Sequence, residues 1–190
     1  MNKGFTLVEL MVALGVFGII MLSGSNFVIQ TLRNSKQAAI QSEVRQNSSI
    51  ILQDIITQDR RDYCVHYESV SNTALLRFSD DPNGTKCASG SQTEYYQDQN
   101  GVITRVATDS AGTQLSFGIL SSRNLAVLNC SSRGLACGQS NPALCLPGLL
   151  STSNGGQTTV SIYSQQSPGQ SSSENCAAVK LSNTVTPRIK

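Results

Sequence analysis

The sequence predicts an α+β protein in which one long N-terminal helix packs its second half on an antiparallel β-sheet head. From residue 5 to about residue 61 the chain has helical character, first apolar and then amphipathic. Beyond residue 63 the pattern changes to short strands separated by turn residues. We therefore expect a lollipop with four segments, residues 1–4, 5–25, 26–62 and 63–190.

The apolar segment, residues 5–25, has the length of a membrane-spanning helix. Residues 5–22 are 18 residues, about 27 Å of helix at ~1.5 Å per residue, close to the ~30 Å hydrocarbon thickness of a bilayer. The segment contains one acidic side chain, Glu9. An ionisable group in hydrocarbon is costly unless it finds a partner, so Glu9 is a candidate functional residue.

The order of the N-terminal segments differs from an ordinary secretory signal, which is cleaved after its apolar region. Here the short polar part comes first, and a cut between Gly4 and Phe5 would leave the helix in the mature chain. The residues G-F-T-L-V-E-L resemble the class III leader junction of type IV prepilins. This resemblance implies a pilin-like lollipop, a leader peptide of residues 1–4, cleavage after Gly4 by a prepilin peptidase, and N-methylation of Phe5.

The same resemblance assigns Glu9 a role in assembly. Cleavage would create an α-amino group on Phe5, four residues before Glu9 and on nearly the same helix face. In a bundle of such helices, the Glu9 carboxylate could pair with the terminal ammonium of a neighbouring chain and so fix the register. The alternative is a plain N-terminal anchor whose glutamate lies at the headgroup level.

Residues 26–62 continue the helix as an amphipathic segment. No proline or glycine occurs from residue 26 to about residue 61. Apolar residues recur at helical spacing, which predicts a helix packing one face on the head: Leu32, Ile40, Val44, Ile51 and Ile55, with Leu52 and Ile56 beside them. A surface helix or a short coiled coil is the alternative, although the spacing is not a strict heptad.

Short strands separated by turn signals are predicted for the head. Asn100-Gly101 is a hairpin signal between two of these strands. We expect one antiparallel sheet whose apolar face covers the helix, and a loop over residues 164–175 by composition. The candidate strands are residues 74–78, 93–97, 102–107, 115–120, 125–128, 158–163 and 177–181.

Six cysteines lie beyond the apolar segment, without a C-x-x-C pair: Cys64, Cys87, Cys130, Cys137, Cys145 and Cys176. An even number in this arrangement favours disulfides in an oxidising compartment. Short loops favour pairing each cysteine with its neighbour in sequence, as Cys64–Cys87, Cys130–Cys137 and Cys145–Cys176. We expect no metal site, because His66 is the only histidine and no paired ligand spacing recurs.

The composition argues against catalysis and nucleic-acid binding. A net charge of +2 with 14% charged residues provides no electrostatic steering of nucleic acid. No G-x-S-x-G, H-E-x-x-H or P-loop motif occurs, so we expect neither an enzyme nor a cofactor. A Cys64 and His66 pair would regain interest if Cys64 were a free thiol. The loop 80–84 has oxygen ligands suited to calcium, or is a plain turn.

A second resemblance concerns the kind of pilin. The hairpin of residues 94–105, with Tyr95-Tyr96, Gly101, Ile103 and Arg105, resembles the Y-x(n)-G-x-L-x-R hairpin of PilW-type minor pilins and J-type pseudopilins of type II secretion, with Ile103 in place of the leucine. The ending of residues 184–188 is also similar to theirs. Major pilins commonly carry a proline where this chain has Asn26, and two cysteines near the C-terminus.

These resemblances imply a minor pilin of a type IV pilus. Its N-terminal helix would contact other minor and major pilins, and it would help to initiate fibre assembly at the inner membrane or lie at the tip. The head would first lie in the periplasm and later in the fibre. The alternatives are a pseudopilin of type II secretion, and a tip adhesin or DNA-uptake module. DNA uptake should show a basic, aromatic-bearing surface, whereas the arginines of the head are scattered in sequence.

Overall fold

The computed structural model describes residues 6–81, 85–122, 125–130, 144–154, 157–166 and 177–186, with no side chains described for residues 22–26. The chain divides into two compact units, Met1–Ala39 and Ile40–Lys190. The elements are α1 (Leu7–Asp59), β1 (Cys64–Val70), β2 (Thr73–Ser79), η1 (Thr85–Cys87), β3 (Gln92–Gln97), β4 (Ile103–Thr108), β5 (Gln114–Ile119), β6 (Leu125–Ala126), β7 (Leu128–Asn129), β8 (Leu146–Pro147), β9 (Leu149–Asn154), β10 (Gln157–Gln166) and β11 (Ala178–Val185).

The first unit holds the apolar part of α1, whose described large apolar side chains are all exposed. Among the residues described, no helix is long and apolar enough to cross a membrane. The predicted span is residues 5–25. The structure does not describe residue 5 at its start, nor the side chains of residues 22–25 at its end. Its boundaries stay a prediction.

The second part of α1 ends earlier and packs over a shorter stretch than the sequence predicts. The helix ends at Asp59, three residues before the predicted end, and the Tyr63 N–H then donates to Ser79 O as the chain enters β1. The placement of Leu32 in the packed stripe is wrong, since its side chain is 58% exposed. Of the predicted stripe, Ile40 is the first residue that packs on the hydrophobic core, and it is partly buried there.

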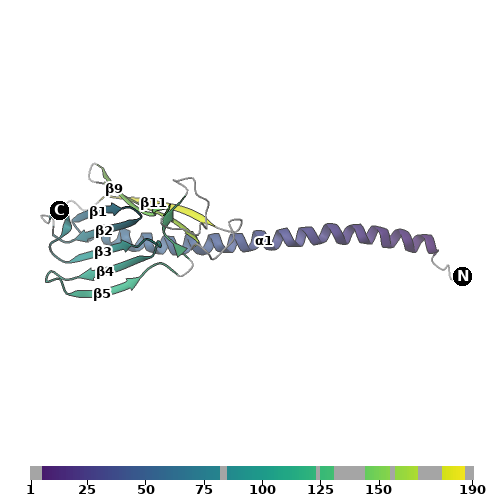
Figure 1. Ribbon diagram of the computed structural model, residues 1–190, viewed down its shortest axis with the longest axis horizontal. Helices are drawn as coiled ribbons and strands as arrows, with labels where there is room; N and C mark the ends of the chain where they lie inside the picture. The colour runs from purple at the N-terminus through teal and green to yellow at the C-terminus, as the bar shows by residue number, and fades with distance from the viewer. Residues whose placement is uncertain are drawn as a thin grey trace. The chain divides into compact units, whose positions relative to one another are not determined.

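Strands β1 to β5 form a five-stranded antiparallel sheet in chain order, visible as neighbouring arrows in Figure 1. The predicted strands 74–78, 93–97, 102–107 and 115–120 match β2 to β5 within about one residue. Gly101 turns the β3–β4 hairpin with φ 79°, as the Asn-Gly signal predicts. Strand β1 was missed because its turn to β2 uses Ser71, at φ 56°, and not a glycine.

A second sheet is centred on β10, so the prediction of one continuous sheet is wrong. Strand β10 pairs with β11 on one side and with β9 and β6 on the other, while β7 and β8 form a separate pair. The predicted strand 125–128 is interrupted at Val127, whose N–H donates to Gly101 O at 2.8 Å. The first three residues of the predicted loop 164–175 belong to β10, which extends to Gln166. Residues 167–175 lie outside the described part of the chain.

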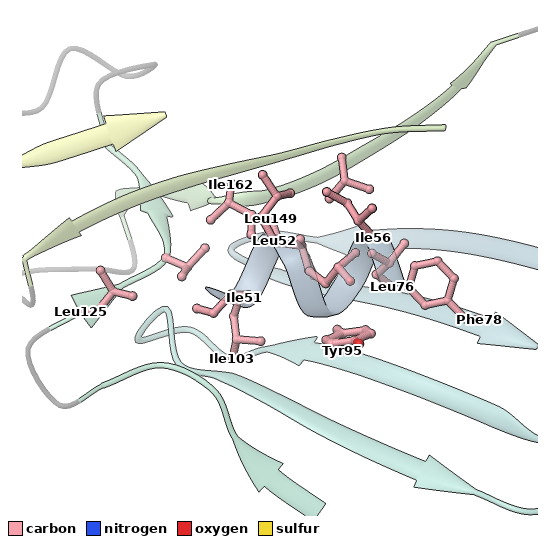
Figure 2. Close-up of a cluster of buried hydrophobic side chains, with 14 of the residues drawn as sticks. Ile51, Leu52, Ile56, Leu76, Phe78, Tyr95, Ile103, Leu125, Leu149 and Ile162 are labelled. Atoms are coloured by element: carbon pink, nitrogen blue, oxygen red, sulfur yellow. The ribbon is translucent and has the colours of Figure 1, made fainter. Parts of the chain in front are cut away.

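Residues 40–59 of α1 pack between the two sheets, which confirms the α+β class with a long helix on antiparallel sheet. Figure 2 shows Ile51, Leu52 and Ile56 of the helix, with the first sheet on one side and Leu149 and Ile162 of the second on the other. Burying each side chain of this size stabilises the fold by about 1.5–3 kcal/mol. From the first sheet come Leu76, Phe78, Tyr95 and Ile103.

Two disulfides join described cysteines. Cys64 is bonded to Cys87, which is the predicted pair. Cys130 is bonded to Cys145, so the predicted pairs Cys130–Cys137 and Cys145–Cys176 are wrong. The reason is the β7–β8 register, in which Asn129 opposes Leu146, and the next position brings Cys130 opposite Cys145 with 4.3 Å between their Cα atoms. Cys137 and Cys176 lie outside the described residues.

Gly148 lies where the chain passes from β8 to β9, and replacing it should destabilise the head. A Cβ there would lie closer than 3.0 Å to backbone atoms of Tyr163, Val127 and Leu128. We expect Gly148→Ala to lower the free energy of unfolding by about 1–3 kcal/mol, the usual cost of overpacking a core. Urea denaturation followed by circular dichroism measures it.

The matched control is Gly118→Ala on β5, where an added Cβ meets no atom within 4 Å. Equal unfolding midpoints for the two variants would contradict the close approach at Gly148.

Candidate functional site

Glu9 lies in the first turn of α1 and forms a reciprocal capping box with Thr6. The Thr6 N–H donates to Glu9 Oε2 at 3.0 Å, and the Thr6 hydroxyl donates to the same oxygen at 3.1 Å. In return the Glu9 N–H donates to Thr6 Oγ1 at 3.3 Å. The arrangement satisfies N–H groups that a helix leaves unpaired at its start.

Thr6 is a residue that the sequence analysis missed. The signal was present, because T-x-x-E before an apolar run is the capping-box pattern. The other predicted residues of this segment, Gly4 and Phe5, lie outside the described residues. Cleavage after Gly4, methylation of Phe5 and pairing of its amine with Glu9 therefore stay predictions. What the structure adds is that Glu9 already has hydrogen-bond donors within its own chain.

In the head, the β3–β4 hairpin is attached to α1 by a partly buried polar contact. The hydroxyl of Tyr95, on β3, donates to Asp54 Oδ2 at 2.8 Å. Arg105, opposite Tyr95 on β4, forms an ion pair with the same carboxylate oxygen, at 3.6 Å from its Nε. The Tyr95 ring is fully buried and meets Phe78 edge to face, with 5.8 Å between centroids. Burial and the Asp54 carboxylate both raise the pKa of Tyr95, so the phenol stays a donor.

The other residues of the hairpin pattern also have structural roles. Ile103 is fully buried in the core. Gly101 combines φ 79° with a close approach, since a Cβ there would lie 2.7 Å from Val127 N. Tyr95 and Arg105 contact α1, Ile103 lies in the core, and Gly101 approaches Val127 beside β6. These residues together attach the hairpin to α1 and to the second sheet. The residues of this sequence pattern therefore hold the hairpin on the helix. We call Tyr95, Gly101, Ile103 and Arg105 the hairpin clamp.

Two further side chains connect the first sheet to β9. The buried Gln97 accepts hydrogen bonds at Oε1 from the N–H groups of Gly148, at 3.1 Å, and Leu149, at 2.9 Å. The Tyr67 hydroxyl donates to Leu149 O at 2.8 Å. These contacts satisfy backbone groups at the start of β9 and hold the two sheets on either side of the helix.

Asp59, the last residue of α1, is a buried carboxylate that sequence analysis missed. Its side chain is fully buried and neither oxygen has a hydrogen-bond partner in the structure. Burial, with a smaller contribution from the charge of Asp62, raises the pKa of Asp59 from 3.8 to about 6. No sequence pattern identifies it, because an aspartate at the end of an amphipathic helix is ordinarily solvated.

The residues considered for metal or catalytic chemistry have other partners. Cys64 is disulfide-bonded, which removes the thiol of a Cys64 and His66 pair. In the loop predicted over residues 80–84, Asp80 Oδ1 accepts from the Ser91 N–H at 2.8 Å, and Asp81 Oδ2 accepts from the Ser89 hydroxyl at 2.5 Å. Residues 82–84 are not described. Within the described ranges, no group of three or more His, Cys, Asp or Glu side chains could hold a metal ion.

Comparison with known families identifies the N-terminal segment. Residues 1–25 match the model of the prokaryotic N-terminal methylation motif. No curated protein and no solved structure matches the chain. The matched motif is a prepilin leader, which implies processing by a prepilin peptidase and association with other pilins, and which fits anchoring in the inner membrane. This motif and the long helix on antiparallel sheet are together consistent with a type IV pilin-like protein.

The hairpin clamp predicts that the Tyr95 hydroxyl stabilises the head. Tyr95→Phe removes the hydrogen bond to the partly exposed Asp54 carboxylate, which keeps its ion pair with Arg105, at a cost of about 0.5–1.5 kcal/mol. The neighbouring Tyr96 is 44% exposed, so Tyr96→Phe is a matched control with little expected effect. Chemical denaturation of both variants tests this, and an equal loss of stability in the two would count against the clamp.

The buried Asp59 predicts a pH-dependent effect on stability. Its pKa is higher in the folded chain than its ordinary value of 3.8, so the folded state disfavours the charged form and loses stability as the pH rises to and through about 6. Asp59→Asn should therefore raise the melting temperature at about pH 7.5, and the gain should shrink towards about pH 4. Differential scanning calorimetry at several pH values measures the difference.

The exposed Glu43→Gln on the same helix controls for the loss of one negative charge. A gain for Asp59→Asn that is equal at both pH values would contradict the burial of this carboxylate in solution.

Proposed function

We propose that the chain is a minor pilin of a type IV pilus that helps to initiate fibre assembly at the inner membrane or lies at the fibre tip. The observation that carries the proposal is the methylation motif of residues 1–25, with a glutamate at position 9. After cleavage behind Gly4, the helix would stay in the mature chain, anchor it in the membrane with the head in the periplasm, and enter the fibre with other pilins. The proposal gives the chain no catalytic role and no cofactor.

In this proposal Glu9 exchanges partners during assembly. In the single chain its carboxylate accepts two hydrogen bonds from Thr6. In a bundle, the terminal ammonium of a neighbouring Phe5 would be a charged donor, so its pair with Glu9 would gain an attraction between opposite charges that the neutral N–H and hydroxyl of Thr6 do not provide. The exchange would set the stagger between neighbouring chains, since any other register leaves the carboxylate without that partner.

Two features support a minor pilin over a fibre-building one. Major pilins commonly carry a proline at the position of Asn26, and α1 runs through this position as one helix. The head is also closed by more than one disulfide, Cys64–Cys87 and Cys130–Cys145, where major pilins usually have a single pair near the C-terminus.

A pseudopilin of type II secretion is the second candidate. The leader is common to both systems, and the hairpin clamp is similar in pattern to that of J-type pseudopilins as well as PilW-type minor pilins. The third reading, a DNA-uptake module or tip adhesin, has less support. Two of the arginines of the head are neutralised by carboxylates, Arg77 by Glu94 at 2.6 Å and Arg105 by Asp54 at 3.6 Å.

Deletion of the gene, with complementation by Glu9→Gln, tests the proposal. We expect deletion to abolish surface fibres, and Glu9→Gln to be processed normally and yet fail to restore them, because a neutral amide cannot pair with the ammonium. Electron microscopy counts the fibres, and intact mass of the membrane-purified chain shows whether it begins at N-methylated Phe5. Glu43→Gln, an exposed glutamate further along the helix, is the control and should restore fibres.

Each rival reading has its own outcome in the same strain. Intact fibres that no longer adhere would indicate an adhesin, fibres present with DNA uptake lost would indicate an uptake module, and loss of protein export would indicate a pseudopilin. A chain that still begins at Met1 or Asn2 would overturn the pilin reading altogether.

A further inference from the structure

Strand β5 is the outer strand of the five-stranded sheet and leaves large apolar side chains uncovered. Among the described strands it pairs with β4 alone, and Figure 1 shows it at the sheet edge. Phe117 is 60% exposed and Ile119 is 63% exposed. Edge strands of soluble proteins are usually protected by charged residues or proline. The sequence of β5, Q-L-S-F-G-I, contains neither.

The exposed side chains belong to an apolar face that reaches this edge. Phe117 pairs with Val106 and Ile119 with Thr104, and Thr104 in turn pairs with Tyr96. This face is opposite to the one that packs on α1, because the intervening Arg105 and Tyr95 contact Asp54 of the helix. Tyr96 is also exposed. We name Tyr96, Val106, Phe117 and Ile119 the outer apolar face.

The backbone at the edge is available for pairing at the same residues. The Leu120 N–H donates to Ile103 O at 2.9 Å. Because backbone groups of an antiparallel strand alternate in direction, Gly118 is directed towards its partner Arg105 on β4. The N–H and C=O groups of Phe117 and Ile119 therefore point to the open edge. The register irregularity at Ala107/Thr108 affects only the other end of the strand, near Gln114.

These features are complementary to a second copy of themselves. If two β5 strands pair antiparallel about a two-fold axis at Gly118, Phe117 of each copy lies opposite Ile119 of the other. Both residues then exchange backbone hydrogen bonds through the groups that point to the open edge, and their apolar side chains meet on one face. No charged residue occurs in β5 to oppose the approach. A membrane surface would leave the backbone groups of the edge unpaired.

We propose that β5 is a homodimerisation edge, at which two copies of the head join their five-stranded sheets into one continuous sheet through antiparallel β5–β5 pairing. The contact is isologous and closes at two copies. Pairing two strands of this length buries less than the ~1,200–2,000 Å² of a standard interface, so the dimer is weak and concentration-dependent.

The test uses the full-length chain purified in mild detergent, with analytical ultracentrifugation over a concentration series. We expect a monomer–dimer equilibrium for the wild type, and at least about a tenfold weaker association for Phe117→Lys, because a lysine would then oppose Ile119. Ser116→Lys, a neighbouring substitution on the opposite face of the strand, is the matched control and should dimerise as the wild type does.

Cross-linking tests the register. Non-hydrogen-bonded partners across an antiparallel pair have Cα atoms ~4.5 Å apart, within the range of a disulfide. Gly118→Cys should therefore yield a covalent dimer that reduction separates, while Ser116→Cys, which lies away from the two-fold axis, should not. Both variants add one cysteine, so disulfide exchange with the native cysteines would affect them equally.

Several results would overturn the proposal. These are a wild type that stays monomeric throughout, a Phe117→Lys variant that associates as strongly as the wild type, or equal cross-linking of the two cysteine variants. Association that continues beyond the dimer would also overturn it, since a two-fold contact is closed. A wild type that stays monomeric and binds lipid vesicles would identify a membrane as the occupant of this edge.

Discussion

The burial of residues 40–59 of α1 between two antiparallel sheets is the constraint on which the rest of the head depends. The core side chains of both sheets pack on the helix, and the helix residues Ile51 and Ile55 are fully buried between them. A helix with one sheet would leave half of this stripe in water. The second sheet, which the sequence analysis did not separate from the first, is therefore required by the width of the stripe.

Polar contacts then determine how the sheets meet the helix. Apolar side chains specify burial but only weakly specify register, whereas hydrogen bonds and ion pairs have preferred distances and directions and so fix which residues meet. Asp54 accepts from Tyr95 and pairs with Arg105, which fixes the hairpin on the helix. Gln97 fixes the start of β9 in the same way. Close backbone approaches at Gly101 and Gly148 become tolerable because neither residue carries a Cβ.

The sequence predicts the parts of this structure that depend on local chemistry. The long helix follows from its apolar spacing, the hairpin from Asn100-Gly101, and the pair Cys64–Cys87 from a short loop. The parts of the structure that depend on contacts between residues distant in sequence cannot be predicted from local sequence patterns. Cys130 pairs with Cys145 because β7 opposes β8, and the predicted strand 125–128 is interrupted where the Val127 N–H bonds to Gly101 O. Asp59 was missed because burial at a helix end is set by neighbours remote in sequence.

The capping box gives Glu9 a role before any assembly partner arrives. A carboxylate in the first turn is favoured by the positive end of the helix, and the reciprocal bonds with Thr6 add to this stabilisation. The Thr6 donors are neutral, whereas the cost of an unpaired charge in hydrocarbon is large. In the proposed function, a neighbouring ammonium would therefore displace Thr6 as the partner of Glu9. This exchange would let one residue serve both the anchored chain and the fibre.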